Sequence, residues 1–473
     1  MDRAPQHQTG RPRRWTTGVA LVAAAALAVI ATTYAASGVS DHAGVQAFPN
    51  VSGAVGTVGL NNTAADNAFF QALGTNGRSC ATCHLPAQGW TITPDELRDR
   101  FERTDGLDPI FRTNDGSNCE AANVSTIRDR RQAFSLLLSK GLIRVPLDVP
   151  AGADFDITSV DDPYRCGAAP TSASMYRRPL PSANLKFLSA VMWDGRASKP
   201  GQAIRDGLIH QVVDAVTGHA QGMPPAPAQV QSIVDFELGL FATQVTDISA
   251  GSLTTGAARS GPGRLARELF CLGINDPLDM RPSIPGACAA SSGGLDPFVF
   301  TLFRGWTDDS SERRQAIARG EAIFNTRPFV IDNVPGLNGR LEDPVRRPIL
   351  TGTCTTCHDT PNAGNHSVPM ALNIGVADAS RRTADLPLYT LRRRATGETV
   401  QTTDPGRAMV TGKWDDIGKF KGPVLRALAA RPPYFHDGSA ATLADVIKFY
   451  NTRFQTRFTE REIADLIAFL EAL

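Results

Sequence analysis

Two copies of a five-residue motif, Cys-x-x-Cys-His, are the part of this sequence most able to do chemistry. The first copy begins at Cys80 and the second at Cys354. In such a motif both thiols can bond to the vinyl groups of a haem, and the adjacent histidine becomes the proximal ligand of the iron. A zinc site would need four clustered ligands and would not use a histidine at that fixed place. The motifs therefore predict two covalently bound haem c groups, attached at Cys80, Cys83, Cys354 and Cys357, with His84 and His358 as iron ligands.

Length and charge limit the class of protein. The chain has 473 residues, which exceeds one typical domain of about 100–200 residues, so two haem domains in tandem are the natural division. Its 48 basic and 47 acidic residues give a net charge of +1. This balance gives no support for nucleic-acid binding or for a basic patch that binds membranes.

The N-terminus has the pattern of an export segment. Arg13 and Arg14 precede an apolar run from Gly18 to about Ala31, and small residues follow. Counted to Ala36, the run is also long enough to cross a membrane. Residues 1–37 are therefore predicted to be a signal peptide or, alternatively, a retained N-terminal anchor in the inner membrane. Both alternatives place the rest of the chain in the periplasm.

Four cysteines lie outside the haem motifs. In an oxidising compartment an even number of cysteines indicates disulfides, although four cysteines allow three pairings. Proximity in the sequence favours Cys119 with Cys166 and Cys271 with Cys288. Free buried thiols are the alternative.

Helical periodicity predicts a mainly α-helical fold with two tandem cytochrome c-like haem domains and loop-rich insertions. Helices are expected from Thr63 and over 230–244 and 316–324, whereas strand signals are weak. The second of these helices would place Ile233, Phe236 and Leu240 on its apolar side. The predicted segments are a tether at 38–62, an N-terminal haem domain at 63–248, a loop-rich insertion at 249–310 and a C-terminal haem domain at 311–473. Within the first domain, residues 94–180 are expected to be a surface excursion.

The C-terminus has the clearest local pattern. Thr442 and Thr459 are each followed three residues later by an acidic residue, which is the pattern of a capping box at a helix start. In the first of these helices Leu443, Val446, Ile447 and Tyr450 share one face, so Tyr450 is expected to point inward. A buried tyrosine needs a partner for its hydroxyl oxygen.

The chain resembles the di-haem cytochrome c peroxidase superfamily, which includes the MauG-type enzymes. The likeness rests on the two haem motifs and on four further stretches, and it covers about residues 63–240 and 311–473. These stretches are Trp193–Ala197, Gly418–Pro423, Pro433–Ser439 and Thr442–Asn451.

The resemblance implies a division of roles. It places the reaction with hydrogen peroxide at the N-terminal haem, electron relay at the C-terminal haem, and Trp193 between them as part of the electron path. The alternative for Trp193 is a packed interface residue. By the same resemblance Tyr450 is the sixth ligand of the second haem, as in MauG-type members, in place of methionine. A core tyrosine is the alternative, and other axial candidates are His366, Met370 and Met409.

The distal side of the first haem departs from the family pattern. No histidine occurs between Leu85 and Ile209, which predicts an open distal face at rest. Cleavage of peroxide still needs a group that moves a proton. The family uses a glutamate after the Trp-Asp-Gly-Arg stretch, but no glutamate stands at matching spacing. His219 is the first substitute and His210 the second, with Asp214 also available; a solvated histidine on a helix face is the alternative for each.

The family also binds calcium through a side-chain amide and main-chain carbonyls. Pro179 stands where that amide is expected, with Asn184 nearby, so calcium is allowed but unsupported. The expected activity is reduction of hydrogen peroxide with electrons from a small periplasmic cytochrome c or cupredoxin. The alternatives are a MauG-like oxidase or oxygenase, which uses high-valent haem iron on a protein or organic substrate, and a non-enzymatic electron carrier.

Overall fold

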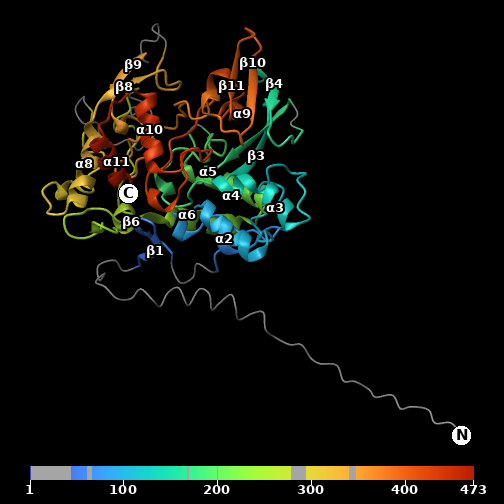
Figure 1. Cartoon of the computed structure of the whole chain (residues 1–473), viewed down its shortest axis with the longest axis horizontal. Coiled ribbons are helices and arrows are strands. Elements are labelled where there is room, and N and C mark those ends of the chain that lie inside the picture. Colours follow the sequence, from blue (N-terminus) through green and yellow to red (C-terminus); the bar gives the residue numbers. More distant parts are fainter. Residues whose placement is uncertain (2–43, 61–65, 168–169, 200, 279–294, 340–347) are drawn as a thin grey trace. The chain divides into compact units, whose positions relative to one another are not determined.

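Two capped helices end the chain and pack beside an earlier one. In the computed structural model, α10 (Leu443–Arg453) and α11 (Glu460–Glu471) begin directly after Thr442 and Thr459, and both capping boxes are formed as predicted. Helix α11 packs against α8 (Glu312–Thr326), as Figure 1 shows. Their close approach needs Gly320, because a Cβ atom there would lie 2.0 Å from the carbonyl oxygen of Asp465. Helix α8 covers the segment where a helix over 316–324 was expected.

The structure describes residue 1 and residues 44–60, 66–167, 170–199, 201–278, 295–339 and 348–473. Almost all of the predicted export segment lies outside these ranges. Among the described residues, no helix has the length and apolar character needed to cross a membrane.

The expectation of a mainly α-helical fold is wrong. Within the described residues, strands β1–β11 form one four-stranded, one three-stranded and two two-stranded sheets, with orders β1-β2-β6-β7, β11-β10-β4, β3-β5 and β8-β9. Many of these strands are only four to six residues long, and some bury neither face continuously. The alternation of apolar and polar residues that marks a strand was therefore hard to recognise in the sequence. The strands are Gln46–Asn50, Gly53–Val58, Ile143–Asp148, Phe155–Asp161, Ser172–Arg177, Phe241–Asp247, Gly251–Ser252, Phe329–Asp332, Ile349–Gly352, Leu388–Arg393 and Thr399–Thr402 in order from β1 to β11.

Part of the expected tether is a β-hairpin. Strands β1 and β2 pair antiparallel, and β2 also pairs with β6. Gly53 has a φ of +143°, and a Cβ atom there would lie 2.1 Å from the carbonyl oxygen of Thr246, so only glycine fits this turn. The hairpin thereby joins the sheet that contains β6, the strand directly after α6 (Pro227–Gly239).

The two expected excursions contain core residues. Helices α2 (Pro94–Thr104), α3 (Ile127–Ala133) and α4 (Ser135–Lys140) enclose an apolar cluster that includes Phe101 and Phe134. The later segment contributes Phe300 and Trp306 to the cluster beneath α8 and α11. Strand β4 pairs with β10 from the C-terminal part of the chain, and the two lie side by side in Figure 1. Distant parts of the chain thus share one sheet. The division into two tandem haem domains stays a prediction.

The first predicted disulfide is present. Cys119 and Cys166 are bonded to each other, with Cα atoms 5.4 Å apart. Cys271 is also disulfide-bonded, but its predicted partner Cys288 lies outside the described residues. The second pairing therefore stays a prediction.

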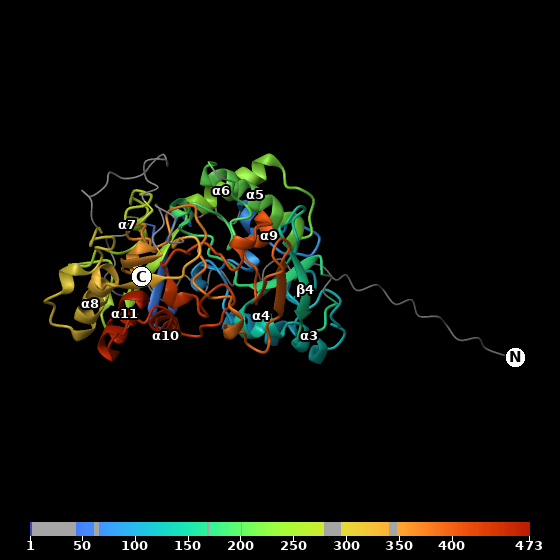
Figure 2. The same ribbon diagram turned by 90° about the horizontal axis from the view of Figure 1, so that it is seen from above.

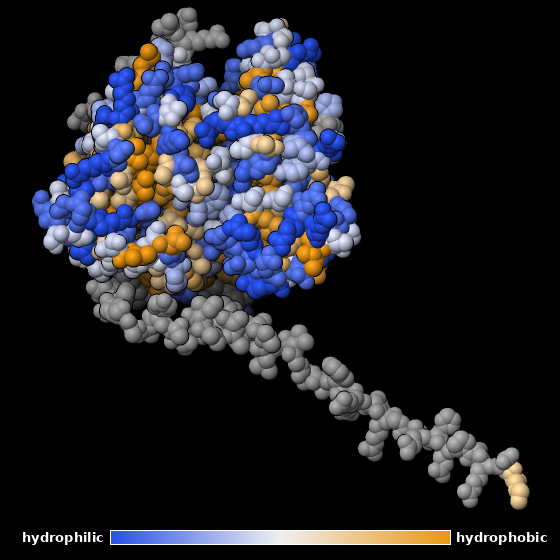
Figure 3. All heavy atoms as spheres, in the orientation of Figure 1, coloured by the Kyte–Doolittle hydropathy of each residue, from blue (hydrophilic) through white to orange (hydrophobic). Residues whose placement is uncertain are grey.

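The remaining α-helices of the described residues are α5 (Ile204–Asp214), α7 (Pro262–Leu265) and α9 (Ala408–Thr411). Helices α5 and α6 lie next to each other in Figure 2 and are in contact. On the face shown in Figure 3 hydrophilic side chains predominate, and apolar ones occur in small groups. The larger concentrations of apolar and reactive side chains lie inside, around two cavities.

Candidate functional site

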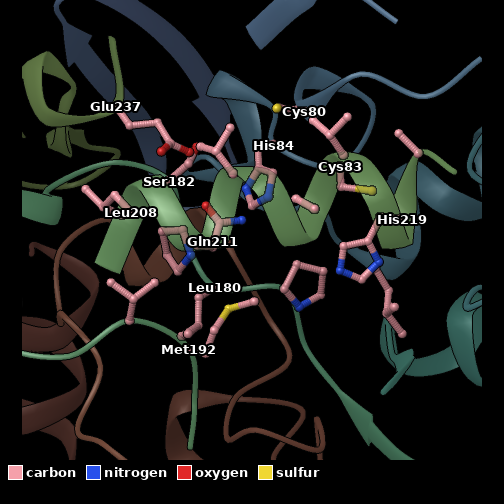
Figure 4. Close-up of a pocket in the computed structure, with 18 of the residues that line it drawn as sticks. Cys80, Cys83, His84, Leu180, Ser182, Met192, Leu208, Gln211, His219 and Glu237 are labelled. Carbon is pink, nitrogen blue, oxygen red and sulfur yellow. The ribbon is translucent and has the colours of Figure 1, made fainter. Parts of the chain in front are cut away.

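The first cavity contains the N-terminal motif. Cys80, Cys83 and His84 line it, and the motif forms a tight turn in which the amide of His84 donates to the carbonyl of Cys80 at 3.0 Å. Neither cysteine is in a disulfide. Burial raises the pKa of the Cys83 thiol to about 11. Figure 4 shows both thiols and the imidazole at one side of the cavity.

The imidazole of His84 is oriented by the backbone. Its Nδ1 lies 2.9 Å from the carbonyl oxygen of Trp90, which can only accept a hydrogen bond. Nδ1 therefore carries the proton, and Nε2 keeps a free lone pair that can bind a metal. Trp90 has a φ of 63°, a conformation uncommon for a bulky residue. Burial lowers the pKa of His84, which keeps the ring neutral.

The second cavity repeats this arrangement. Cys354, Cys357 and His358 line it, and Nδ1 of His358 lies 2.7 Å from the carbonyl oxygen of Gly364. Burial lowers the pKa of His358 to about 4. In each cavity the motif thus supplies two free thiols and a neutral imidazole with an available Nε2. This donor set fits a covalently attached haem.

Tyr450 lines the second cavity, as its helical phase predicts. Burial, together with the thiols of Cys357 and Cys354, raises the pKa of its hydroxyl group. The hydroxyl makes no hydrogen bond with any described residue. A hydrogen-bond acceptor or a metal ion in the second cavity could therefore contact the hydroxyl oxygen of Tyr450.

The competing axial candidates lie in different places. His366 lines the second cavity, and its Nδ1 has no hydrogen-bond partner among the described residues. Burial lowers its pKa to about 4. Met409 belongs to a separate apolar cluster around Trp414 and Tyr389, and Met370 does not line the cavity.

Three polar residues, Arg78, Asp115 and His219, line the first cavity together. Helix α5 continues into a π-helical turn, Ala215–His219, which places His219 in the cavity wall. Its Nδ1 is bonded to Asp115, whose other oxygen accepts from Arg78 at 2.5 Å. Burial raises the pKa of Asp115, but the hydrogen bond from His219 and the charge of Arg78 outweigh it, so the net shift is downward. The carboxylate is thus held charged, and Nε2 of His219 is left for other partners.

The second histidine candidate lies elsewhere. His210 does not line the cavity, and its side chain is 52% exposed. It faces Asp214 at 3.6 Å on the outer side of α5. Of the two histidines only His219 is in a position to meet a ligand in the first cavity.

Glu237 is a carboxyl group that sequence reasoning missed. It lies on α6, is 5% exposed and lines the first cavity, and Figure 4 shows its carboxyl group directed toward that cavity. Burial raises its pKa to about 8, and Oε2 has no hydrogen-bond partner among the described residues. The buried face of α6 is Val230, Ile233, Val234 and Glu237, at spacings i, i+3, i+4 and i+7. The helical spacing of Glu237 with Val230, Ile233 and Val234 could therefore have revealed it as a buried residue. The expected buried side of the helix was instead the one that carries Phe236. Asp115 and Arg78 carry no comparable signal, because their meeting with His219 depends on the fold.

Both cavities share one wall, which we define as Arg178–Pro181, Trp193 and Lys421. The indole Nε1 of Trp193 donates to the carbonyl of Arg178 at 2.8 Å, and the amide of Lys421 donates to the carbonyl of Trp193 at 2.9 Å. The ring of Trp193 therefore stands between the two cavities in a fixed orientation.

Buried ion pairs hold this wall in place. Arg177 bonds to Asp194 at 2.5 Å and to Asp404 at 2.7 Å, and all three side chains are buried. The two carboxylates outweigh burial and raise the pKa of Arg177. These contacts join the Trp-Asp-Gly-Arg stretch to the C-terminal part of the chain.

The polar atoms near Asn184 are engaged in hydrogen bonds within the chain. Both polar atoms of its amide are bonded to the backbone of Ala242, at 2.9 and 3.0 Å. The carbonyl of Pro179 accepts from Thr91. Among the described residues, no group of three or more His, Cys, Asp or Glu side chains could hold a metal ion.

Comparison with known proteins finds partial similarity to cytochrome c peroxidases. A cytochrome c peroxidase, IdrP1, from Denitromonas iodatirespirans is 33% identical over 140 residues, which is 25% of this chain and 36% of that protein. A cytochrome c551 peroxidase from Nitrosomonas europaea is 38% identical over 76 residues, which is 15% of this chain and 23% of that protein. The chain thus matches only about a third or less of each relative's length. No protein-family model matches the chain.

A solved structure of a MauG-like protein associated with microbial copper homeostasis is 16% identical, covers 86% of this chain and 87% of that one, and has a TM-score of 0.35. The peroxidase matches confirm the resemblance of this chain to the di-haem cytochrome c peroxidase and MauG superfamily.

Proposed function

We propose that this chain is a periplasmic di-haem c-type oxidoreductase that reduces hydrogen peroxide at its N-terminal site with electrons relayed through its C-terminal site. One observation carries the proposal. Each of two cavities pairs two free thiols with a neutral, oriented imidazole, and Trp193 stands in the wall that they share. Peroxidase relatives support the same activity.

In each cavity the two thiols would hold a haem and the histidine Nε2 would bind its iron, and the bound haem would supply the redox chemistry. The protein contributes orientation. Trp90 and Gly364 fix the two imidazole rings through their carbonyl oxygens, which also makes each ring a better electron donor to a metal.

His219 would transfer protons in the first cavity. Reduction of one peroxide to two waters consumes two electrons and two protons, so a group that holds and releases protons is required. Asp115 bonds Nδ1 of His219 and thereby directs Nε2 away from itself, and Arg78 keeps Asp115 charged. Such a pair resembles the arrangement in which a carboxylate orients a histidine that acts as acid and base.

Trp193 would carry electrons between the sites, and a small periplasmic cytochrome c or cupredoxin would supply them. The indole lines both cavities, and its hydrogen bond to Arg178 prevents rotation. A packing role alone would not require Trp193 to line both cavities, so its position favours a role in electron transfer.

Peroxide consumption by the purified holoprotein tests the proposal. With a reduced small cytochrome c as donor, the protein should oxidise two equivalents of donor per peroxide. A protein that carries two haems but neither consumes peroxide nor oxidises the donor in its presence would contradict it.

Tyr450 favours a second candidate function, an oxidase of the MauG type that acts on a protein or organic substrate. A phenolate ligand stabilises high oxidation states of iron and lowers the reduction potential relative to a thioether. Addition of peroxide to the ferric protein without reductant separates the two. A long-lived oxidised species would favour the oxidase, whereas an oxidised species that decays quickly to the ferric state would favour the peroxidase.

A further inference from the structure

The shared wall carries positive charge that has no negative partner. Arg178 and Lys421 are 4% and 8% exposed, and both line both cavities. Arg178 donates only to the carbonyl oxygens of Lys140, Arg431 and Pro432. The ammonium group of Lys421 makes no hydrogen bond with a described residue. No carboxylate of the described residues pairs with either cation.

A third cation extends the cluster into the second cavity. Arg431 lines that cavity and donates only to the carbonyls of Arg426 and Val424. Burial is the main cause that lowers the pKa of Lys421 to about 7 and that of Arg431 to about 10. Buried charges without partners are costly, so chains retain them where a ligand supplies the opposite charge.

The neighbouring residue shows that this chain can pair a buried guanidinium with carboxylates of its own. Arg177 precedes Arg178 and bonds to two carboxylates, Asp194 and Asp404. Arg178 has none. The difference between adjacent residues indicates that Arg178 is directed to a partner from outside the chain.

A haem has propionate carboxylates at the edge of its ring roughly opposite the vinyl groups. In the first cavity the vinyl edge would face Cys80 and Cys83. Figure 4 shows Leu180 and Met192 across the cavity from these thiols; Leu180 belongs to the shared wall, and Met192 directly precedes Trp193 of that wall. The propionate edge would therefore point toward Arg178 and Lys421.

We propose that Arg178, Lys421 and Arg431 form an anion-binding cradle for the propionate carboxylates of both haems, with Arg178 and Lys421 serving both sites and Arg431 serving the C-terminal site. This inference rests on the proposed occupancy by two haems but not on the peroxidase activity. Charge-assisted hydrogen bonds from these cations would fix the haem edges on either side of Trp193. The cations would also raise the reduction potential of both irons, because positive charge favours the reduced state.

Redox titration of the holoprotein, followed by its absorption spectrum, tests the cradle. Lys421→Met removes one charge at nearly constant length and should lower the midpoint potentials of both haems. We expect about a tenfold shift of each ferric–ferrous equilibrium, or 59 mV for one electron. Lys421→Arg should restore both potentials. Lys413→Met, which removes a charge from an exposed position, is the matched control.

Arg431→Gln provides a second variant if Lys421→Met does not mature. Because Arg431 lines only the second cavity, this change should lower only the C-terminal potential. Potentials in Lys421→Met equal to those in Lys413→Met, or an equal effect of Arg431→Gln on both haems, would overturn the cradle. A haem assay of the wild-type protein comes first. Fewer than two haems per chain would overturn the proposed cofactor content, and this inference with it.

Discussion

The two cavities share a donor set but differ in what surrounds it. The first has acid and base groups in its wall: His219 bonded to Asp115, and the unpartnered carboxyl group of Glu237. The second is lined mainly by apolar side chains, including Phe420 and Phe454, together with Tyr450 and His366, and no acidic residue is among its described lining. Proton transfer needs groups of the first kind, whereas a site that stores and relays electrons needs an enclosed metal and few proton donors. Under the proposed function, the same motif would therefore serve two different purposes.

Removal of His219 should have the largest effect on this difference. His219→Ala should lower kcat/KM for peroxide by about 10²–10⁴-fold, because proton transfer would lose its positioned group. Steady-state peroxide consumption is the measurement. His210→Ala is the matched control, since His210 lies on the exposed side of the same helix and should leave the rate unchanged. Equal rates for the two variants would contradict the role of His219.

Tyr450→Phe should change only the second site. Loss of an oxygen ligand should raise the potential of the C-terminal haem by about 59 mV or more, a tenfold shift of its equilibrium. The ferric spectrum of that haem should change as well. Tyr434 lines the same cavity, but its hydroxyl donates to the carbonyl of Leu428 at 3.0 Å. Tyr434→Phe should therefore leave the spectrum as it is; a Tyr450→Phe protein with the wild-type spectrum would show that Tyr450 only packs.

Replacement of Trp193 should weaken the link between the cavities. Trp193→Phe should slow electron transfer between the haems by on the order of tenfold, equivalent to about 1.4 kcal/mol in the barrier. Flash reduction of one haem and observation of the other measures this rate. Trp414→Phe, in a separate apolar cluster, should not affect it. Equal rates in both variants would favour a packing role for Trp193.

Glu237 should give the smallest effect, a dependence of stability on pH. Burial raises its pKa from 4.5 to about 8, so between these values the folded chain holds a proton that the unfolded chain has released. Stability should therefore fall as pH rises through this range, by up to about 1.4 kcal/mol per pH unit.

Glu237→Gln should make this slope shallower and raise Tm at pH 8 relative to the wild type, whereas Glu321 and Asp359, whose pKa burial raises to about 7, keep part of the slope. Asp235→Asn, at an exposed position of the same helix, should leave the slope unchanged. A slope in Glu237→Gln as steep as that of the wild type would show that Glu237 is already ionised in the fold.

Local patterns predicted some parts of this molecule and not others. The capping boxes at Thr442 and Thr459 predicted both C-terminal helices, because a cap depends only on neighbouring residues. The start of the helix predicted from Thr63 lies outside the described residues, and the described residues that follow form a short 3-10 helix, Ala68–Phe70, in place of an α-helix. The predicted helix over 230–244 ends at Gly239, where strand β6 follows.

The strands were missed for a different reason. Strand β4 pairs with β10, more than two hundred residues later in the chain, and no local pattern reports such a partner. The same limit applies to the first cavity. The sequence identified His219 as a candidate, but only the fold brings Asp115 to its Nδ1.

The spectrum of the ferric holoprotein, before and after peroxide, tests the central claim that the two sites are unequal. Electron paramagnetic resonance of the wild-type protein should show one high-spin haem at the open first site and one low-spin haem at the second. Peroxide should change only the high-spin signal, and Tyr450→Phe should change only the low-spin one. Two low-spin haems that do not respond to peroxide would contradict the account and leave the chain as an electron carrier.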